Sequence, residues 1–295
     1  MRNKQMMEKQ TRNRKSAMNS LPLKNRIAAL TECSARKARN VSADAQPAIF
    51  EHTFPVRYHE LDSHGNVSPV TLLNYLQDMA GLHATRLGIA VSDLRRLGLT
   101  WVLSRLHLVI THYPRAEESV LIRTWPATRQ GLFSCREFEL SGTGGIGVGT
   151  ATTSWAVLNI DSRRPVMIEG CLPAYPLHPL RAIEDDFATL PLLPGVAASE
   201  HSFRVLRSDL DSNHHVNNAI FAAWALETVP DEVAAGSLTE LEISFRAEVL
   251  YGQTVLSRCA VTEPGLCLHQ IVNQKDGREL ARLRSRWTQS GGDTA

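Results

Sequence analysis

The chain has 295 residues, 43% of them hydrophobic and 21% charged, which is the composition of an ordinary globular protein. It contains no run of 18 or more apolar residues, so the sequence predicts no membrane-spanning helix. Its five cysteines, at positions 33, 135, 171, 259 and 267, include no CxxC pair, which favours free thiols in a reducing compartment over a disulfide framework or a zinc site.

Residues 1–48 are predicted to form a basic extension without a stable fold. The net charge of the chain is only +2, but residues 1–49 hold eleven lysines and arginines against three acids, so the remainder is mildly acidic. The extension has no sustained apolar periodicity and no apolar h-region, which argues against a secretory signal. An organelle transit peptide and a start at one of three internal methionines both remain open. Charge alone gives only nonspecific attraction to nucleic acid, so we expect no nucleic-acid partner.

A first domain is predicted over residues 49–160. Ser68-Pro69 indicates the start of a helix, because serine caps helix N-termini and proline suits the first helical position. Apolar residues recur after it at helical spacing, and Gly88 is a typical end signal. This helix is more hydrophobic than a surface helix needs to be, so we expect a sheet to wrap it. Strands are predicted at Phe54–Arg57, Thr100–His112, Ser119–Thr128, Phe133–Ser141 and Gly149–Asn159.

A glycine-rich stretch and a proline-rich stretch interrupt the chain near the end of this domain. Gly142–Gly147 matches the GxGxxG spacing of dinucleotide-binding proteins. That motif requires a helix after it, whereas Val148–Thr153 is typical of a strand, so we interpret the glycines as a hairpin turn. Residues 161–199 carry six prolines and little periodicity, which predicts an ordered linker across the surface of the fold.

The sequence then repeats itself. Residues 203–216 match residues 54–67 without a gap at an offset of 149, with Asp62 meeting Asp211. Further along the offset is 135, so the second copy is shorter around its helix. The repeat predicts two similar domains, the second over residues 200–290, related by a pseudo-twofold axis. We expect a six-stranded antiparallel sheet in each, and pairing of the two sheets edge to edge would protect their edges.

The densest polar stretch is Asp209–Asn218, which combines two carboxylates, two imidazoles and three side-chain amides just before an apolar helical run. Its last two asparagines are natural helix caps. Capping does not explain Asp211, Asn213 and His215, which recur at every second position and would share one face of an extended segment. The first copy lacks this set, since positions 64–66 hold His, Gly and Asn. We therefore expect the second copy to carry the chemistry and the first to shape the pocket.

The segments Asp209–Asn218, Trp224–Pro230 and Glu242–Glu248 together resemble acyl-acyl carrier protein thioesterases. The resemblance covers roughly residues 50–290, including Leu72–Gln77 on the first helix, and leaves out the basic extension. It implies an α+β fold of two tandem hotdog domains, each a long helix wrapped by an antiparallel sheet, forming a pseudo-twofold double hotdog. It also implies hydrolysis of fatty acyl-acyl carrier protein to free fatty acid and holo carrier protein, with no cofactor and no metal.

Matched by position, the catalytic residues of that family fall on Asp211, Asn213, His215 and Glu248, the last in a strand predicted at Leu241–Leu250. Plant members often carry a cysteine after that glutamate, where this chain has Val249, so we expect direct attack by water. Cys259 is a poor substitute for a nucleophile at that place.

The expected division of labour reflects the needs of thioester hydrolysis. Glu248 or Asp211 would hold and activate the water, and these alternatives stay open. Asn213 would orient the water or donate to the developing oxyanion. His215 would position the water or the carbonyl and shuttle the proton. Backbone N–H groups at 216–218 would add positive potential. A metal site formed by His214 with His215 and Asp211 is not expected, because alternating directions separate the two imidazoles.

The substrate is expected to be long and apolar. Four residues of the first helix are predicted to line an acyl tunnel in the N-terminal domain while also packing in its core: Leu72, Leu73, Leu76 and Met79. Carrier proteins are acidic, so exposed arginines would mark the docking face. Candidates for this face are Arg95, Arg96, Arg129 and Arg136.

Other functions compete with this interpretation. A hotdog acyl-CoA thioesterase would share the fold and the chemistry and differ only in the carrier. A non-enzymatic acyl-binding sensor would not need the polar set of the second copy. A hotdog dehydratase is less favoured, because its acid–base pair normally lies on facing copies. We expect a monomer or a homodimer, in a bacterial cytoplasm given the departures from the plant pattern, or in a plastid for a plant protein.

Overall fold

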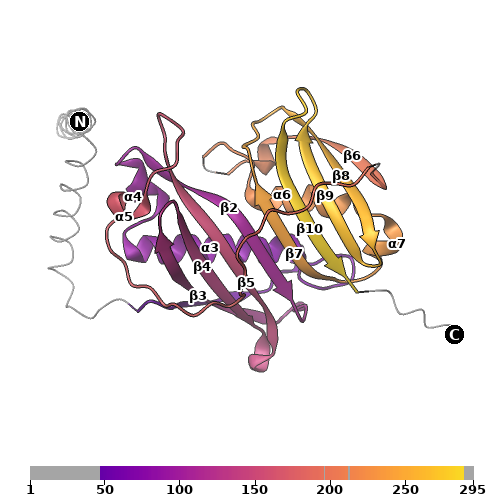
Figure 1. Cartoon of the computed structure of the whole chain (residues 1–295). Coiled ribbons are helices and arrows are strands. Elements are labelled where there is room, and N and C mark those ends of the chain that lie inside the picture. The colour runs from indigo at the N-terminus through magenta and orange to yellow at the C-terminus, as the bar shows by residue number, and fades with distance from the viewer. Residues whose placement is uncertain (1–46, 196, 212, 289–295) are drawn as a thin grey trace, which may run out of the picture.

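The computed structural model describes residues 47–195, 197–211 and 213–288, so nearly all of the predicted basic extension lies outside the described residues. One ten-stranded antiparallel sheet dominates the fold, in the order β1-β3-β4-β5-β2-β7-β10-β9-β8-β6 (Figure 1). The strands of its first half are β1 (Phe50–Pro55), β2 (Leu99–Ile110), β3 (Ser119–Gln130), β4 (Phe133–Ser141) and β5 (Gly147–Asn159). Those of its second half are β6 (Ser199–Arg204), β7 (Leu238–Phe245), β8 (Thr254–Glu263), β9 (Leu266–Asn273) and β10 (Glu279–Trp287).

The strand order confirms the sequence repeat. Reading inward from each edge, β1, β3, β4, β5 and β2 correspond to β6, β8, β9, β10 and β7. The two inner strands, β2 and β7, pair antiparallel, with Leu108 opposite Leu241, and join the halves into one sheet. The expectation of six strands in each half is wrong for the part of the chain that the structure describes, where each half supplies five.

Two helices lie on one face of this sheet, one in each half (Figure 1). The first is α3 (Pro69–Leu87), which begins and ends as predicted: the Ser68 side chain accepts a hydrogen bond from the Thr71 amide at 3.2 Å, and Gly88 takes the left-handed conformation with φ 71°. The second is α6 (Asn218–Glu227), capped by Asn217. It is much shorter because Pro230 comes soon after, and proline disfavours helical backbone at the residue before it.

The short elements connect these parts. A 3-10 turn precedes each main helix, η1 (Tyr58–Glu60) in the first half and η3 (Arg207–Asp209) in the second. The predicted hairpin turn contains η2 (Thr143–Gly145). The remaining helices are α4 (Val91–Arg95), α5 (Ile168–Cys171) and α7 (Asp231–Ala234). Among the described helices, none has the length and apolarity that a membrane crossing needs.

The segment between α5 and β6 crosses the sheet on the face opposite the helices (Figure 1). Its Arg181 pairs with buried Glu137 of β4 at 2.8 Å, and its Asp185 contacts His107 of β2 at 2.8 Å. Burial raises the pKa of Glu137, so the Arg181 guanidinium and the Ala182 amide are needed to satisfy its carboxylate. Arg282 of β10 donates to the Leu190 carbonyl at 2.7 Å. The crossing segment is thus fixed to strands of both halves.

Candidate active site

Asp211 closes a tight turn that carries the other polar side chains of the second half. One of its carboxylate oxygens accepts the backbone N–H groups of Asn213 at 2.7 Å and His215 at 3.2 Å. The other accepts the side-chain amide of Asn213 at 3.2 Å. His214 sits at the tip of the turn with φ 63° and its side chain is exposed. The three hydrogen bonds that the Asp211 carboxylate accepts all hold the turn, and they leave it little capacity to activate water.

The first half contains the same turn without the chemistry. Asp62 accepts the backbone N–H groups of His64 at 2.8 Å and Asn66 at 3.0 Å, and Gly65 takes the left-handed conformation that His214 takes in the second half. The expectation of an extended segment with alternating side chains is therefore wrong. The residues converge because the turn closes on an aspartate, and the left-handed residue at the tip is costly for histidine and free for glycine.

His215 and Glu248 form the pair that distinguishes the second half. His215 Nε2 lies 3.0 Å from Glu248 Oε2, and both side chains are partly exposed, at 41% and 34%. Glu248 does not lie in a strand, contrary to prediction: β7 ends at Phe245, and Glu248 lies in the loop after it. Leaving the sheet there frees the carboxylate to face the turn, because strand side chains point along the two sheet normals.

Two arginines of the first half reach into this site. Arg95 at the end of α4 donates to the side-chain oxygen of Asn213, and Arg163 in the turn after β5 contacts Glu248 Oε1. Arg163 is itself left-handed, with φ 54°, and its side chain is 71% exposed. The site therefore lies between the two halves. Arg163 was not predicted, because nothing in its local sequence indicates a contact with a loop some 85 residues away.

An amide cluster ties α3 to the start of α6 immediately beyond the polar turn. Gln77 donates to the side-chain oxygen of Asn217 at 2.8 Å, and that oxygen also caps the Ala219 amide at 3.0 Å. Asn217 in turn donates to Asn74 at 3.4 Å, and Asn218 donates to Gln77 at 3.4 Å. The first helix thereby holds the end of the turn in place.

The expected contribution of backbone N–H groups at 216–218 is mostly wrong. The Val216 amide donates to the Val249 carbonyl at 3.2 Å, and the Asn217 amide donates to the Asp209 carbonyl at 2.8 Å. Since these two groups already have partners, they are not available to a developing oxyanion.

The predicted acyl-tunnel residues all lie in the core. Exposed fractions are at most 2% for the four side chains Leu72, Leu73, Leu76 and Met79. They belong to the main apolar core, which also contains Phe221 and Trp224 of α6. Their packing role is therefore plain, and their contact with an acyl chain stays a prediction.

The four docking arginines differ in exposure. Arg95 and Arg96 are exposed. Arg129 is half-buried, donates to the Pro173 carbonyl at 2.9 Å and stacks on Tyr175. Arg136 is wrong as a docking residue, because it is only 7% exposed and donates to the His83 ring at 3.0 Å. Burial lowers its pKa to about 10.

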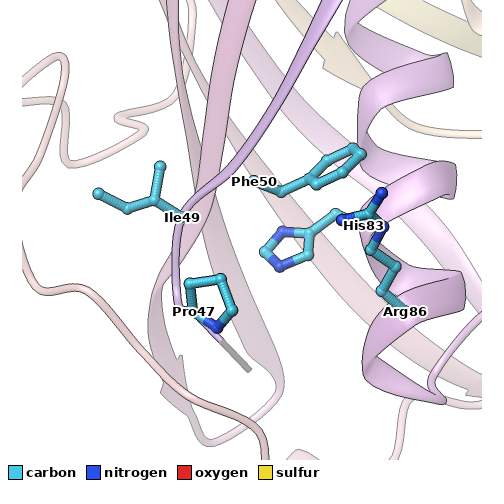
Figure 2. A pocket seen from close by; sticks show the side chains of 5 residues that line it. All are labelled: Pro47, Ile49, Phe50, His83 and Arg86. Carbon is cyan, nitrogen blue, oxygen red and sulfur yellow. The ribbon is translucent and has the colours of Figure 1, made fainter. Parts of the chain in front are cut away.

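A separate pocket of about 200 Å³ opens between β1 and the end of α3 (Figure 2). Phe50 at the start of β1 lines it together with Pro47 and Ile49 from the segment just before the strand, and His83 and Arg86 line it from the helix. Arg86 lies over the Phe50 ring at 4.3 Å. None of these residues belongs to the polar turn or to the His215–Glu248 pair, so the pocket is not part of the candidate site.

The positions of the side chains argue against a cysteine nucleophile and against a metal site at the polar turn. Val249 is fully buried beside Glu248, and Cys259 is fully buried on β8. The contact with Cys267 and burial both raise the pKa of Cys259, so its thiol is no nucleophile. Exposed His214 does not gather with His215 and Asp211 among the described groups of potential metal ligands.

A sheet of two hotdog halves around two helices, with a His–Glu pair beside an amide-rich turn at their junction, defines a double hotdog protein with a candidate acid–base site. The model of the acyl-ACP thioesterase N-terminal domain matches residues 47–172, and the model of the C-terminal domain of the same family matches residues 195–289. The chain belongs to the acyl-ACP thioesterase family.

Individual relatives agree with this assignment. The chloroplastic oleoyl-acyl carrier protein thioesterase 1 of Arabidopsis thaliana is 29% identical over 274 residues, covering 81% of this chain and 75% of that protein. A chloroplastic acyl-[acyl-carrier-protein] hydrolase of Cuphea viscosissima is 26% identical, covering 81% of this chain but only 62% of that protein. The crystal structure of an acyl-ACP thioesterase from Bacteroides thetaiotaomicron shares the fold with a TM-score of 0.70 at 22% identity, covering 82% of this chain and 98% of that one.

Proposed function

We propose that the chain hydrolyses fatty acyl-acyl carrier protein by direct attack of water on the thioester. The observation that carries this proposal is the 3.0 Å contact between His215 and Glu248 beside the turn that presents Asn213. An imidazole held by a carboxylate is a natural proton acceptor for a water molecule. Such a pair has no counterpart in the matching turn of the first half, where Tyr113 replaces Glu248 and donates to the Leu238 carbonyl.

In this mechanism His215 is the general base and Glu248 orients it. The Glu248 carboxylate accepts a hydrogen bond from His215 Nε2. Among the described residues His215 Nδ1 makes no hydrogen bond, so in this mechanism Nδ1 takes the proton from the attacking water. Asn213 directs its side-chain oxygen at Arg95 and its amide at Asp211, which leaves the second amide hydrogen for the thioester oxygen. The protonated His215 then returns the proton to the leaving thiolate. Asp211 fixes the turn and takes no proton.

Arg95 and Arg163 supply the charge that the carrier requires. In the free protein their guanidinium groups contact Asn213 and Glu248. The arm of an acyl carrier protein is attached through a phosphodiester, which carries one negative charge and presents two free oxygens that a guanidinium can bind bidentately. We assign these two arginines to the phosphate, so that substrate binding draws Arg163 away from Glu248 Oε1 while Glu248 Oε2 keeps its contact with His215.

The proposal is tested by mass-spectrometric measurement of the fatty acid released from acyl-acyl carrier protein and from acyl-CoA. We expect release from both, with a higher kcat/KM for the carrier-protein substrate, because the carrier adds an acidic surface that acyl-CoA lacks. A preference for acyl-CoA would favour the alternative acyl-CoA thioesterase. Binding of the substrates without release would favour the acyl-binding sensor and contradict the proposal. The predicted bacterial cytoplasm and the monomer or homodimer go beyond this test and remain predictions.

A further inference from the structure

Three potential metal ligands meet in the core of the second half, away from the polar turn. They are Cys259 on β8 and Cys267 and His269 on β9. The register of these strands places Cys259 opposite His269, with Cys267 two residues before it on the same face. All three side chains are fully buried, and a ligand atom from each lies within 4.8 Å of the other two.

The histidine of this cluster is incompletely satisfied. His269 Nε2 lies 2.8 Å from the Ser285 hydroxyl, but the buried Nδ1 has no hydrogen-bond partner among the described residues. A buried polar atom without a partner is costly and calls for an explanation such as an ion.

We propose that Cys259, Cys267 and His269 bind one zinc ion. Two thiolates and a neutral imidazole balance the two positive charges of the ion, so the loaded site adds no net charge to an apolar core. Binding releases one proton from each thiol, and no electron is transferred. Zinc–sulfur bonds of about 2.3 Å and zinc–nitrogen bonds of about 2.0 Å place tetrahedral ligands roughly 3.5–3.8 Å apart, so ligand atoms that now lie within 4.8 Å of one another close by at most about 1.3 Å.

Two serines of neighbouring strands lie beside the cluster. Ser199 on β6 pairs with Cys259, and Ser285 on β10 pairs with Cys267. Both hydroxyls already have partners, Ser199 with the Thr228 carbonyl and Ser285 with His269 Nε2 at 2.8 Å, so a water molecule completes the tetrahedron around the ion. Sequence spacing does not reveal this site, because a zinc motif usually places two cysteines three or four positions apart, whereas here a hairpin brings positions 259 and 267 together.

The role of the ion is structural. Val229, Val233 and Ala234, from the end of α6 and from α7, pack against the two cysteines together with Trp287 of β10. An ion here fastens β8 to β9 beneath those helices. Its removal is therefore expected to lower the melting temperature of the full chain and to leave the turnover measured well below that temperature unchanged.

The test uses the full chain, purified under reducing conditions without chelator from zinc-supplemented cells. We expect about one zinc ion per chain by elemental analysis, and cobalt substitution should give thiolate-to-cobalt charge-transfer bands together with intense tetrahedral d–d bands. The variant Cys259→Ser/Cys267→Ser should retain less than about a tenth of the metal. Cys171→Ser, which removes a buried thiol from α5 of the first half, serves as the matched control and should bind metal as the wild type does.

The wild-type protein decides the matter even where the double variant fails to fold. If reduced wild-type chain takes up neither zinc nor cobalt, the site does not exist. An intact mass two hydrogens lower under non-reducing conditions, restored by reductant and absent from the double variant, would show a Cys259–Cys267 disulfide and also overturn the proposal. Equal metal content in wild type and a folded double variant would place the ion elsewhere. None of these outcomes depends on the proposed thioesterase activity.

Discussion

Asp211 and Asp62 close matching turns in the two halves, and of these two turns only that of Asp211 carries the proposed catalytic groups. Each aspartate accepts two backbone N–H groups of its own turn. A carboxylate occupied in this way stabilises the backbone and is poorly placed to accept a proton from water. Because Asp62 makes the same two backbone hydrogen bonds in a turn without the proposed catalytic groups, we assign Asp211 a structural role rather than a catalytic one.

Replacing either aspartate tests this assignment. Asp211→Ala and Asp62→Ala should each lower the free energy of unfolding by about 1–3 kcal/mol, because both leave backbone donors without partners. Only Asp211→Ala should also lower kcat for acyl-acyl carrier protein, since its turn presents Asn213 and His215. Urea denaturation and the fatty-acid release assay measure the two effects. A kcat for Asp62→Ala as low as that for Asp211→Ala would contradict the assignment.

His83 makes the fold sensitive to acid. Its Nδ1 accepts from Arg136 at 3.0 Å, and burial, then Arg136 and Arg86, lower its pKa to about 3. The unfolded histidine titrates near 6.5, so between these two values the unfolded chain binds the extra proton and stability falls as the pH drops.

The expected slope is up to about 1.4 kcal/mol of unfolding free energy for each pH unit below about pH 6. Burial lowers the pKa of His269 to about 4, which adds a slope of the same sign. Urea denaturation between about pH 6 and pH 4.5 should therefore show a smaller slope in His83→Gln than in the wild type and in the exposed-histidine control His59→Gln, the difference being the contribution of His83. An equal slope in all three proteins would assign the acid sensitivity to other groups.

At the scale of elements, the contact between α3 and α6 holds the active turn. Gln77 reaches Asn217, the N-cap of α6, from the other half of the molecule. We expect Gln77→Ala to lower kcat about ten-fold, because small displacements of catalytic groups cost rate steeply. Asp78→Ala changes the next residue of α3, which is exposed, and should leave kcat near normal. Equal rates for the two variants would show that the amide cluster does not position the site.

Sequence patterns predicted the elements better than they predicted the site. The limits of β4 and the cap residues of α3 agree with the structure because both depend on local alternation and capping chemistry. The position of Glu248 in a loop was missed, since the apolar alternation of β7 runs on beyond its hydrogen-bonded end. Arg163 was missed because its contact joins two loops that are distant in the chain.

At the scale of the whole molecule, the two halves share one site. The second half holds His215 and Glu248, and the first half contributes Arg95 and Arg163. The repeat predicted the pseudo-twofold sheet. It could not predict the contacts of Arg95 with Asn213 and of Arg163 with Glu248, because these contacts are not repeated in the two halves. In the proposed function these two arginines make recognition of the carrier an electrostatic property of the folded molecule.

This property predicts a salt effect. Arg163→Ala should raise KM for acyl-acyl carrier protein about ten-fold with a smaller change in kcat, and rising salt should raise the wild-type KM because screening weakens charge attraction. Arg164 is the exposed neighbour, and Arg164→Ala is the matched control with an expected KM near that of the wild type. A salt-independent KM, or equal effects of the two variants, would count against carrier recognition by Arg163.

His215 and Glu248 are proposed to act as one unit on water, and a double-mutant cycle on kcat tests this most directly. His215→Ala and Glu248→Ala should each lower kcat by about 10²-fold or more. The kcat of the double variant should be close to that of the less active single variant, because groups that act together lose their effect together. Near-normal rates in both single variants, or strictly multiplicative losses in the double variant, would contradict this mechanism.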